Sequence, residues 1–171
     1  MPDTERITDQ ENRTFDSSLG DWTGDAVWEI YPYGDYGGIA KFYLGPAKHS
    51  GQMILEYPHL NIKLNGTYTL TFVYYNIIPP LQSITTFKVT DGTYTFEDFV
   101  LIDDTHPWKP AILYFDTPLD WNKLTTILEI TIEAIPPTES TMFCDNFSIM
   151  GEDFPPVPAV KIQYLPIMGM G

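Results

Sequence analysis

The chain has few basic residues and a single cysteine. Nine lysines and arginines stand against 23 aspartates and glutamates among 171 residues, a formal net charge of −14. Nucleic acids and anionic lipid surfaces both attract clustered lysine and arginine, so the charge argues against either as a partner. With only Cys144 no internal disulfide can form, and its apolar neighbours indicate an inert buried thiol.

The sequence also lacks the segments that carry proteins to or across membranes. Residues 1–5 offer neither a basic n-region nor an apolar h-region, and no run of about 18 apolar residues occurs. We therefore expect either a secreted module expressed without its signal or a protein made in a cytoplasm and assembled there, as a virion protein is. The expected location is a virion or an extracellular surface.

The short motifs of common enzymes are missing as well. There is no Gly-x-Ser-x-Gly elbow, no glycine-rich phosphate loop and no His-Glu-x-x-His, and His49, His59 and His106 lack the spacing of zinc ligands. Glu129 and Glu133 share one strand face, but about 13 Å separates positions i and i+4 of a strand, too far for a glycosidase pair. We expect no enzymatic activity, and a jelly-roll glycoside hydrolase is the less favoured alternative.

What the sequence has instead is strand-like alternation. In residues 67–75 one face carries Tyr68, Leu70, Phe72 and Tyr74, and in residues 124–134 one face carries Leu128, Ile130 and Ile132. A period of two predicts strands with one buried face, and no segment predicts a convincing helix. Aromatic residues, 15% of the chain, also favour strands.

Turn signals separate these strand-like segments. Asn65-Gly66 and Asp91-Gly92 predict tight turns, and proline pairs mark further loops. Between Ile84 and Phe87 the alternation slips by one residue, which predicts a bulge near Thr85-Thr86. Many short strands at this spacing predict an all-β fold, an antiparallel β-sandwich of jelly-roll type.

Three parts are expected along the chain. Residues 1–11 are predicted to be a flexible acidic arm, residues 12–151 the sandwich domain, and residues 152–171 a proline-rich linker with an apolar tail. Residues 159–165 form one more strand-like segment. The assembly residues predicted there are Val160, Ile162, Tyr164 and Leu165. The tail is expected to pack either on its own domain or on a partner, which is another copy or an assembly shell.

Two short motifs, one near each end of the domain, suggest a cation site. The first is Asn12-Arg13-Thr14-Phe15-Asp16 followed by Gly20-Asp21-Trp22, and the second covers residues 142–149. In a regular strand Asp145 shares a face with Phe143, Phe147 and Ile149. A carboxylate on an inward apolar face needs a partner, and Asp16 is the candidate to share that partner.

These motifs resemble those of carbohydrate-binding modules of the galactose-binding-like jelly-roll type. There a Phe-Glu pair stands in the first strand and Asp-Asp or Asp-Asn in the last, as Phe15-Asp16 and Asp145-Asn146 do here. The resemblance spans roughly residues 12–150. It implies a structural Ca²⁺ held by Asp16 and Asp145, with backbone carbonyls of residues 50–52 as helpers, because calcium takes six to eight hard oxygen ligands.

Clustered aromatic residues are the candidates for sugar binding. Trp28, Tyr31, Tyr33 and Tyr36 lie in a segment rich in glycine, and Trp108 and Trp121 offer further flat rings. Sugar rings stack their apolar faces on such side chains. The alternative for each ring is a place in the core or under a loop.

Two functions of different kinds fit these features of the sequence. The favoured one is a structural or adhesive accessory of a larger assembly, most of all a phage capsid or tail decoration, with weak affinity for a neutral polysaccharide. The alternative is a glycan-binding module, freestanding or appended to an enzyme, of a secreted bacterial or archaeal protein. Neither function involves nucleic acid or a membrane.

Overall fold

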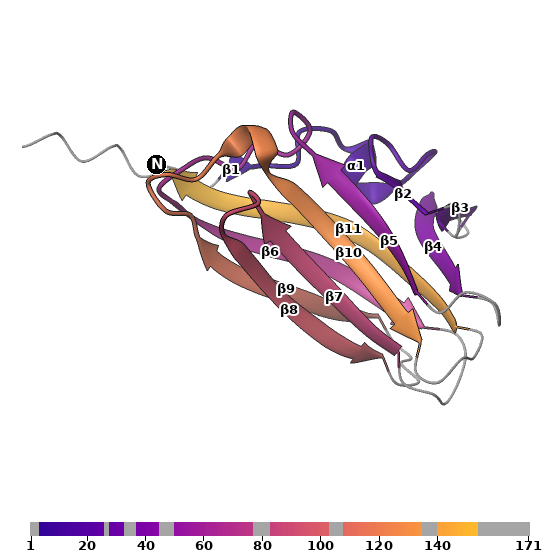
Figure 1. The fold of residues 1–171 in the computed structure, drawn as a ribbon. Coiled ribbons are helices and arrows are strands. Elements are labelled where there is room, and N and C mark those ends of the chain that lie inside the picture. The colour runs from indigo at the N-terminus through magenta and orange to yellow at the C-terminus, as the bar shows by residue number, and fades with distance from the viewer. Residues whose placement is uncertain are drawn as a thin grey trace, which may run out of the picture.

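Two antiparallel sheets pack face to face in the computed structural model (Figure 1). The structure describes residues 4–25, 28–32, 37–44, 50–76, 83–102, 108–134 and 140–153. Every strand pairing within them is antiparallel. The predicted all-β sandwich of jelly-roll type is confirmed.

The six-stranded sheet is organised around the last strand. Its order is β3 (Trp28–Pro32), β4 (Gly38–Leu44), β11 (Ser140–Asp153), β6 (Gly66–Asn76) and β9 (Lys109–Asp116). On one side β11 pairs with β6 along nearly its whole length. On the other side it pairs first with β4 and then, near its end, with the short β1 (Thr4–Glu5).

The five-stranded sheet covers the inner face of the first. Its order is β2 (Thr23–Gly24), β5 (Ser50–Glu56), β10 (Ile127–Ala134), β7 (Ser83–Thr90) and β8 (Thr95–Ile102). The only helical segments in the described residues are α1 (Glu11–Thr14) and the 3-10 helix η2 (Lys123–Thr125). No helix in that part of the chain is long and apolar enough to cross a membrane.

The core between the sheets follows the predicted alternation. The inward faces of β6 and β10 carry seven side chains that are at most 6% exposed: Tyr68, Leu70, Phe72, Tyr74, Leu128, Ile130 and Ile132. Phe72 stacks on Phe147 of β11 at 4.7 Å between ring centroids, and it meets Phe87 of β7 edge to face. Burial of such side chains contributes roughly 1.5–3 kcal/mol each and supplies most of the driving force for folding.

The flexible arm predicted over residues 1–11 is corrected for its described part. Thr4 and Glu5 pair with β11, and Arg6 and Ile7 are 4% and 2% exposed. The Glu5 carboxylate accepts hydrogen bonds from the Ser148 hydroxyl and the Ile149 amide at 2.6 and 2.9 Å. Composition alone does not reveal these contacts, because they join residues more than 140 positions apart.

The predicted bulge is also corrected. β7 pairs with β10 and β8 in unbroken register, so Thr85 and Thr86 hold no extra residue. Thr85 is instead a fully buried polar residue, and its hydroxyl contacts the sulfur of Met142 at 3.2 Å. The bulge of this fold lies in β11, between Asp145 and Ser148.

The turn prediction at Asp91-Gly92 is confirmed. The pair links β7 to β8, with Gly92 at φ +92°. The Asp91 carboxylate accepts hydrogen bonds from the amides of Thr93, Tyr94 and Asn122, each at 2.8 Å. Burial alone would raise the pKa of this carboxyl, but these hydrogen bonds bring its pKa below the ordinary value.

We expect Asp91→Ala to lower the free energy of unfolding by about 2–4 kcal/mol at pH 7, because the change leaves amides without an acceptor. A depressed pKa in the folded state gives stabilisation that is present above an aspartate's ordinary pKa of about 4 and is lost as pH falls through the lowered value. Denaturant unfolding of both proteins at pH 7 and pH 3 should therefore show the difference shrinking in acid.

Asp120→Ala is the control for this prediction. Asp120 is exposed and accepts one hydrogen bond from the Tyr94 hydroxyl, so we expect a loss below about 1 kcal/mol. Equal losses for the two variants, or an Asp91→Ala loss that does not change with pH, would contradict the structural role given to Asp91.

Candidate functional site

The bulge in β11 decides which side chains face outward. Asn146 adopts a left-handed conformation with φ 55°, and the register to β6 shifts around it. Cys144 before the bulge and Phe147 after it therefore both face the core. The predicted common face of Asp145 with Phe147 and Ile149 is wrong: Asp145 lies with Phe143 on the outer face of the six-stranded sheet.

A row of aromatic side chains crosses that outer face. We call Tyr31, Phe143, Tyr75 and Trp108 the aromatic row. The first three lie in β3, β11 and β6, and Trp108 directly precedes β9. Ring centroids are 5.2 Å apart for Tyr31 and Phe143, 5.9 Å for Phe143 and Tyr75, and 5.5 Å for Tyr75 and Trp108. These three distances place the two ends of the row at most about 17 Å apart.

The aromatic row ends in rings that solvent reaches. Tyr31 is 40% exposed and Trp108 is half-buried, while Phe143 between them is 2% exposed. The Lys41 ammonium lies 5.5 Å from the centroid of the Tyr31 ring and 2.6 Å from the Glu29 carboxylate. One end of the row thus combines a flat ring with hydrogen-bonding charged groups.

The outer face continues beyond the row as a surface of hydroxyl and apolar groups. Strand pairing places Thr69 beside Tyr114 and Thr71 beside Ile112. Tyr114, 73% exposed, and Ile112 are open to solvent. Hydroxyls next to flat or apolar surface are the combination that binds sugars, which have polar edges and apolar ring faces.

Asp145 lies between these two parts of the face. Asp145 is half-buried, and the main-chain amide of Asn146 donates a hydrogen bond to its carboxylate. The Oδ1 atom of that carboxylate is buried and accepts no hydrogen bond. Burial raises the pKa of Asp145 to about 6, and the negative charge of Asp16 acts in the same direction. The structure thus brings the two predicted acidic residues into electrostatic contact.

Helix α1 positions Asp16. Phe15 directly after the helix has φ 52°, and the Asp16 carbonyl then accepts a hydrogen bond from the Gly38 amide at 3.1 Å. A Cβ on Gly37 would lie 2.7 Å from Asp16 Oδ1, and one on Gly38 would lie 2.3 Å from the Phe15 carbonyl oxygen. Glycine at these positions lets the start of β4 pass directly over the segment that carries Asp16.

The oxygen atoms around Asp16 and Asp145 supply part of what a hard cation needs. An orphaned carboxylate oxygen and a second carboxylate suit calcium, and the Phe15 carbonyl lies nearby. The described residues hold no group of three or more His, Cys, Asp or Glu side chains that could bind a metal, so carbonyls and water would supply the other ligands. The predicted helpers at residues 50–52 are not available, because they lie in β5 of the opposite sheet and pair with β10.

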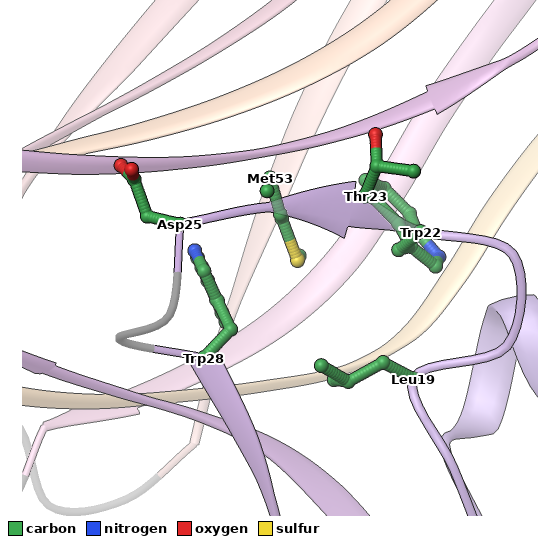
Figure 2. A pocket seen from close by; sticks show the side chains of 7 residues that line it. Leu19, Trp22, Thr23, Asp25, Trp28 and Met53 are labelled. Carbon is green, nitrogen blue, oxygen red and sulfur yellow. The ribbon is translucent and has the colours of Figure 1, made fainter.

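Trp28 is not a surface ring, contrary to prediction. It is 7% exposed and packs on Phe42 with centroids 4.7 Å apart. It lines a pocket of about 240 Å³ together with residues of β2 and β5 (Figure 2). Trp121 is likewise in the core, 3% exposed and packed on Phe96. Both rings stabilise the fold, and the ligand role predicted for Trp28 stays a prediction that concerns this pocket alone.

The remaining predicted residues lie outside the described part of the chain. Tyr33 and Tyr36 belong to residues 33–36, and the assembly residues belong to residues 154–171. Sequence reasoning missed Tyr75, Phe143 and Lys41 as members of the candidate site. The sequence does contain a signal for Tyr75, because this aromatic residue ends the outward face of residues 67–75. The threonines that precede it on that face make the face look polar and so mask the signal.

Solved structures match this chain by fold, whereas no family model and no curated protein matches it. TmCBM61, solved in complex with β-1,4-galactotriose, has a TM-score of 0.58 at 17% identity and covers 83% of this chain and 97% of its own. A family 16 carbohydrate-binding module has a TM-score of 0.59 at 15% identity and covers 84% and 98%. The fold is that of carbohydrate-binding modules. The resemblance drawn from the end motifs is thereby confirmed as a likeness of fold.

A third match is the enzymatically active domain of bacteriophage CBA120 tailspike protein 4. Its TM-score is 0.53 at 10% identity, and the match covers 84% of this chain and 21% of that one. At such identity the likeness concerns the fold alone.

The bulge that separates outward Asp145 from inward Phe147 gives a prediction about Asn146. We expect Asn146→Gly to keep the free energy of unfolding within about 1 kcal/mol, because glycine accepts positive φ readily. Asn146→Val should lower it by about 1–2 kcal/mol or more, because a β-branched residue is strained in this region. Thermal and denaturant unfolding measure both changes, and equal stability of the two variants would show that the bulge does not depend on this conformation.

Proposed function

We propose that the outer face of the six-stranded sheet binds a neutral polysaccharide and that the protein is a non-catalytic glycan-binding module. The aromatic row carries this proposal: four rings in contact cross the strands on the solvent side, where the core gains nothing from them. Contiguous aromatic surface on the outer face of a sheet is a frequent mark of a binding surface. The shared fold with modules whose names refer to carbohydrate supports the same conclusion.

Charge favours a neutral ligand over an acidic one. The net charge of −14 repels polyanions, and Lys41 at the row is neutralised by Glu29. An uncharged chain of β-linked sugars can lie along the rings and exchange hydrogen bonds with the Lys41–Glu29 pair. The row extends well beyond one ring, so it offers stacking surface to more than one sugar unit of the chain.

A non-catalytic role is supported by the location of the glutamates that most resembled a catalytic pair. Glu129 lies on the five-stranded sheet, away from the aromatic row, and its carboxylate binds the Lys88 ammonium at 2.8 Å. Glu133 is on the same strand, four residues further on. Neither carboxylate is placed to act on a ligand bound to the outer face.

A second proposal concerns calcium. We propose that Asp16 and Asp145 share a structural Ca²⁺, supported by the unpaired buried Oδ1 of Asp145 and by the adjacent negative charge of Asp16. When bound, the cation would join the segment after α1 to the central strand of the sheet. It would thereby stabilise the face that carries the ligand site without taking part in any reaction.

Membership of a larger assembly is the third proposal, and a virion decoration is the form it takes. It is supported by an apolar edge strand, β8, on which Phe99 and Leu101 are 58% and 51% exposed. Surfaces of this kind are usually covered by another chain or segment. The assembly role and glycan binding are compatible, because they use different sheets.

The glycan proposal predicts a loss of affinity when the row is interrupted. Tyr31→Ala and Trp108→Ala should each weaken binding to soluble xylan, β-1,4-galactan or mixed-linkage β-glucan by about 1–3 kcal/mol, or roughly 5- to 150-fold in Kd. Affinity electrophoresis identifies the polysaccharide, and calorimetry then measures the variants against it.

Tyr57→Ala is the matched control. Tyr57 is 38% exposed, nearly as much as Tyr31, but it follows β5 and contacts Lys123 away from the outer face. Its removal should leave binding unchanged. Absence of binding to every neutral polysaccharide tested, or equal losses for Tyr57 and Tyr31, would refute the proposed site.

The calcium proposal predicts that excess chelator lowers the melting temperature by several degrees, because removal of a bound cation takes its binding free energy from the folded state. Asp145→Ala should melt at one temperature with or without chelator, whereas Asp120→Ala should keep the sensitivity of the unchanged protein. Elemental analysis of the purified protein provides an independent readout. A chelator-insensitive protein that contains no metal would be evidence against the site.

A further inference from the structure

Strand β8 is the last strand of the five-stranded sheet and exposes an apolar surface at its edge. β8 pairs with β7 on one side, and it ends the strand order on the other. Phe99 and Leu101 point outward, and pairing puts Ile84 of β7 directly beside Leu101. Among the described edge residues this half of β8 carries no charge, although edge strands usually use charge to prevent association.

The main chain of β8 is also oriented to accept another strand. The Phe99 amide donates to the carboxylate of its neighbour Asp98 at 2.8 Å, which shows that this N–H points away from β7. Main-chain groups alternate in direction along a strand, so the N–H and C=O of Leu101 point to the same open side. The Asp98 side chain covers the Phe99 donor in the isolated chain and has to release it when a strand pairs here, whereas the Leu101 N–H is already directed at the open side.

The sequence of residues 159–165 matches this edge in pattern and charge. Val160, Ile162 and Tyr164 alternate with Lys161 and Gln163, and Lys161 is the only charged residue of the segment in a chain of net charge −14. On β8 the outward residues include Phe99 and Leu101, whereas Asp98 belongs to the opposite face. A strand that lays its apolar face beside Phe99 and Leu101 therefore puts Lys161 on the same side as Asp98.

Strand direction indicates a second copy rather than the same chain. β11 ends at the same end of the sandwich at which β8 begins (Figure 1). A series of contacts connects the two strand ends: Asp153 pairs with Gly66, Thr67 pairs with Asp116, and Phe115 stacks on Phe96. A tail that folded back on its own β8 would have to run parallel to it. A tail from a second copy can run antiparallel, which matches every other pairing in this structure and is the more stable arrangement per residue.

We propose that residues 159–165 of one copy add to the β8 edge of a second copy as an antiparallel strand, with Ile162 opposite Phe99 and Val160 opposite Leu101. In this register Lys161 is diagonal to Asp98, within reach of its long side chain. Reciprocal exchange of the two tails closes a two-fold symmetric dimer. The inference rests on the assembly role proposed above and names its surface and its partner, a second copy of this chain.

Cysteine cross-linking tests the register directly. Because Cys144 is buried, the double variant Phe99→Cys/Ile162→Cys has one accessible thiol at each position. Cα atoms opposite each other in an antiparallel pair are about 5.5 Å apart, which suits a disulfide. We expect mild oxidation to convert the 19.5 kDa chain to a covalent dimer on a non-reducing gel. The matched control, Tyr114→Cys/Ile162→Cys, places the thiol on edge strand β9 of the other sheet and should stay monomeric.

A disulfide formed within one chain would show that the tail covers its own β8 and would overturn the exchange. Absence of any cross-link, or equal cross-linking of the control, would overturn the edge itself. Failure of the cross-link does not by itself refute the broader assembly role. Light scattering tests that role separately, because the mass of a chain truncated after Asp153 reports whether the tail supports any association.

A charge exchange provides a second readout. Lys161→Glu should weaken dimerisation at least tenfold, and Lys161→Glu combined with Asp98→Lys should restore it. Sedimentation equilibrium measures the dissociation constants. Restoration by Asp120→Lys, an exposed acidic position beside Tyr94 and several residues from the proposed contact, would show a general charge effect and would refute that contact. Glycan affinity should stay unchanged in all of these variants, since the aromatic row lies on the other sheet.

Discussion

The whole arrangement depends on a one-residue interruption in β11. This strand pairs with β6 along its length and with β4 and β1 in succession, so its alternation is imposed on half the molecule. Without the extra residue at Asn146, Cys144 and Phe147 could not both face the core. The same step leaves Asp145 on the outer face, in the interval between β4 and β1 that the segment after α1 fills. A local backbone irregularity thus determines the core packing, the position of the acidic pair and the outer face that carries the aromatic row.

The two sheets differ in what their outer faces contain. On the six-stranded sheet, rings from separate strands contact one another and end beside an ion pair, which is an arrangement suited to a ligand with flat apolar faces and polar edges. On the five-stranded sheet the outer side is polar at its centre, where Lys88 binds Glu129, and apolar only at the β8 edge. This division is what the two proposals require, with the polysaccharide on one side of the sandwich and the protein partner on the other.

The fold was predictable from the sequence because it follows from short-range patterns. Alternation at Tyr68–Tyr74 and Leu128–Ile132 and the turn at Asp91 each depend on neighbouring residues, and the structure confirms them. The errors concern long-range effects. Thr85 replaces an apolar residue in the core without any bulge. The bulge at Asn146 puts Asp145 and Phe147 on opposite faces, which a count of the sequence period does not detect. The aromatic row joins residues that are far apart in the sequence, so it can be recognised only when the strand order is known. The sequence predicts Tyr31 and Trp108 as single binding residues but not Tyr75 and Phe143.

The unequal burial of the tryptophans has a spectroscopic consequence. Of the four indoles in the chain, Trp22, Trp28 and Trp121 are at most 7% exposed, and Trp108 alone is half-buried, with its ring stacked on Tyr75. The emission of the three buried rings is set by the interior and is insensitive to the solvent. Trp108 contributes the red-shifted component, so the molecule carries its own fluorescent reporter at one end of the aromatic row, and quenching by iodide or acrylamide reads the accessibility of that end without any label.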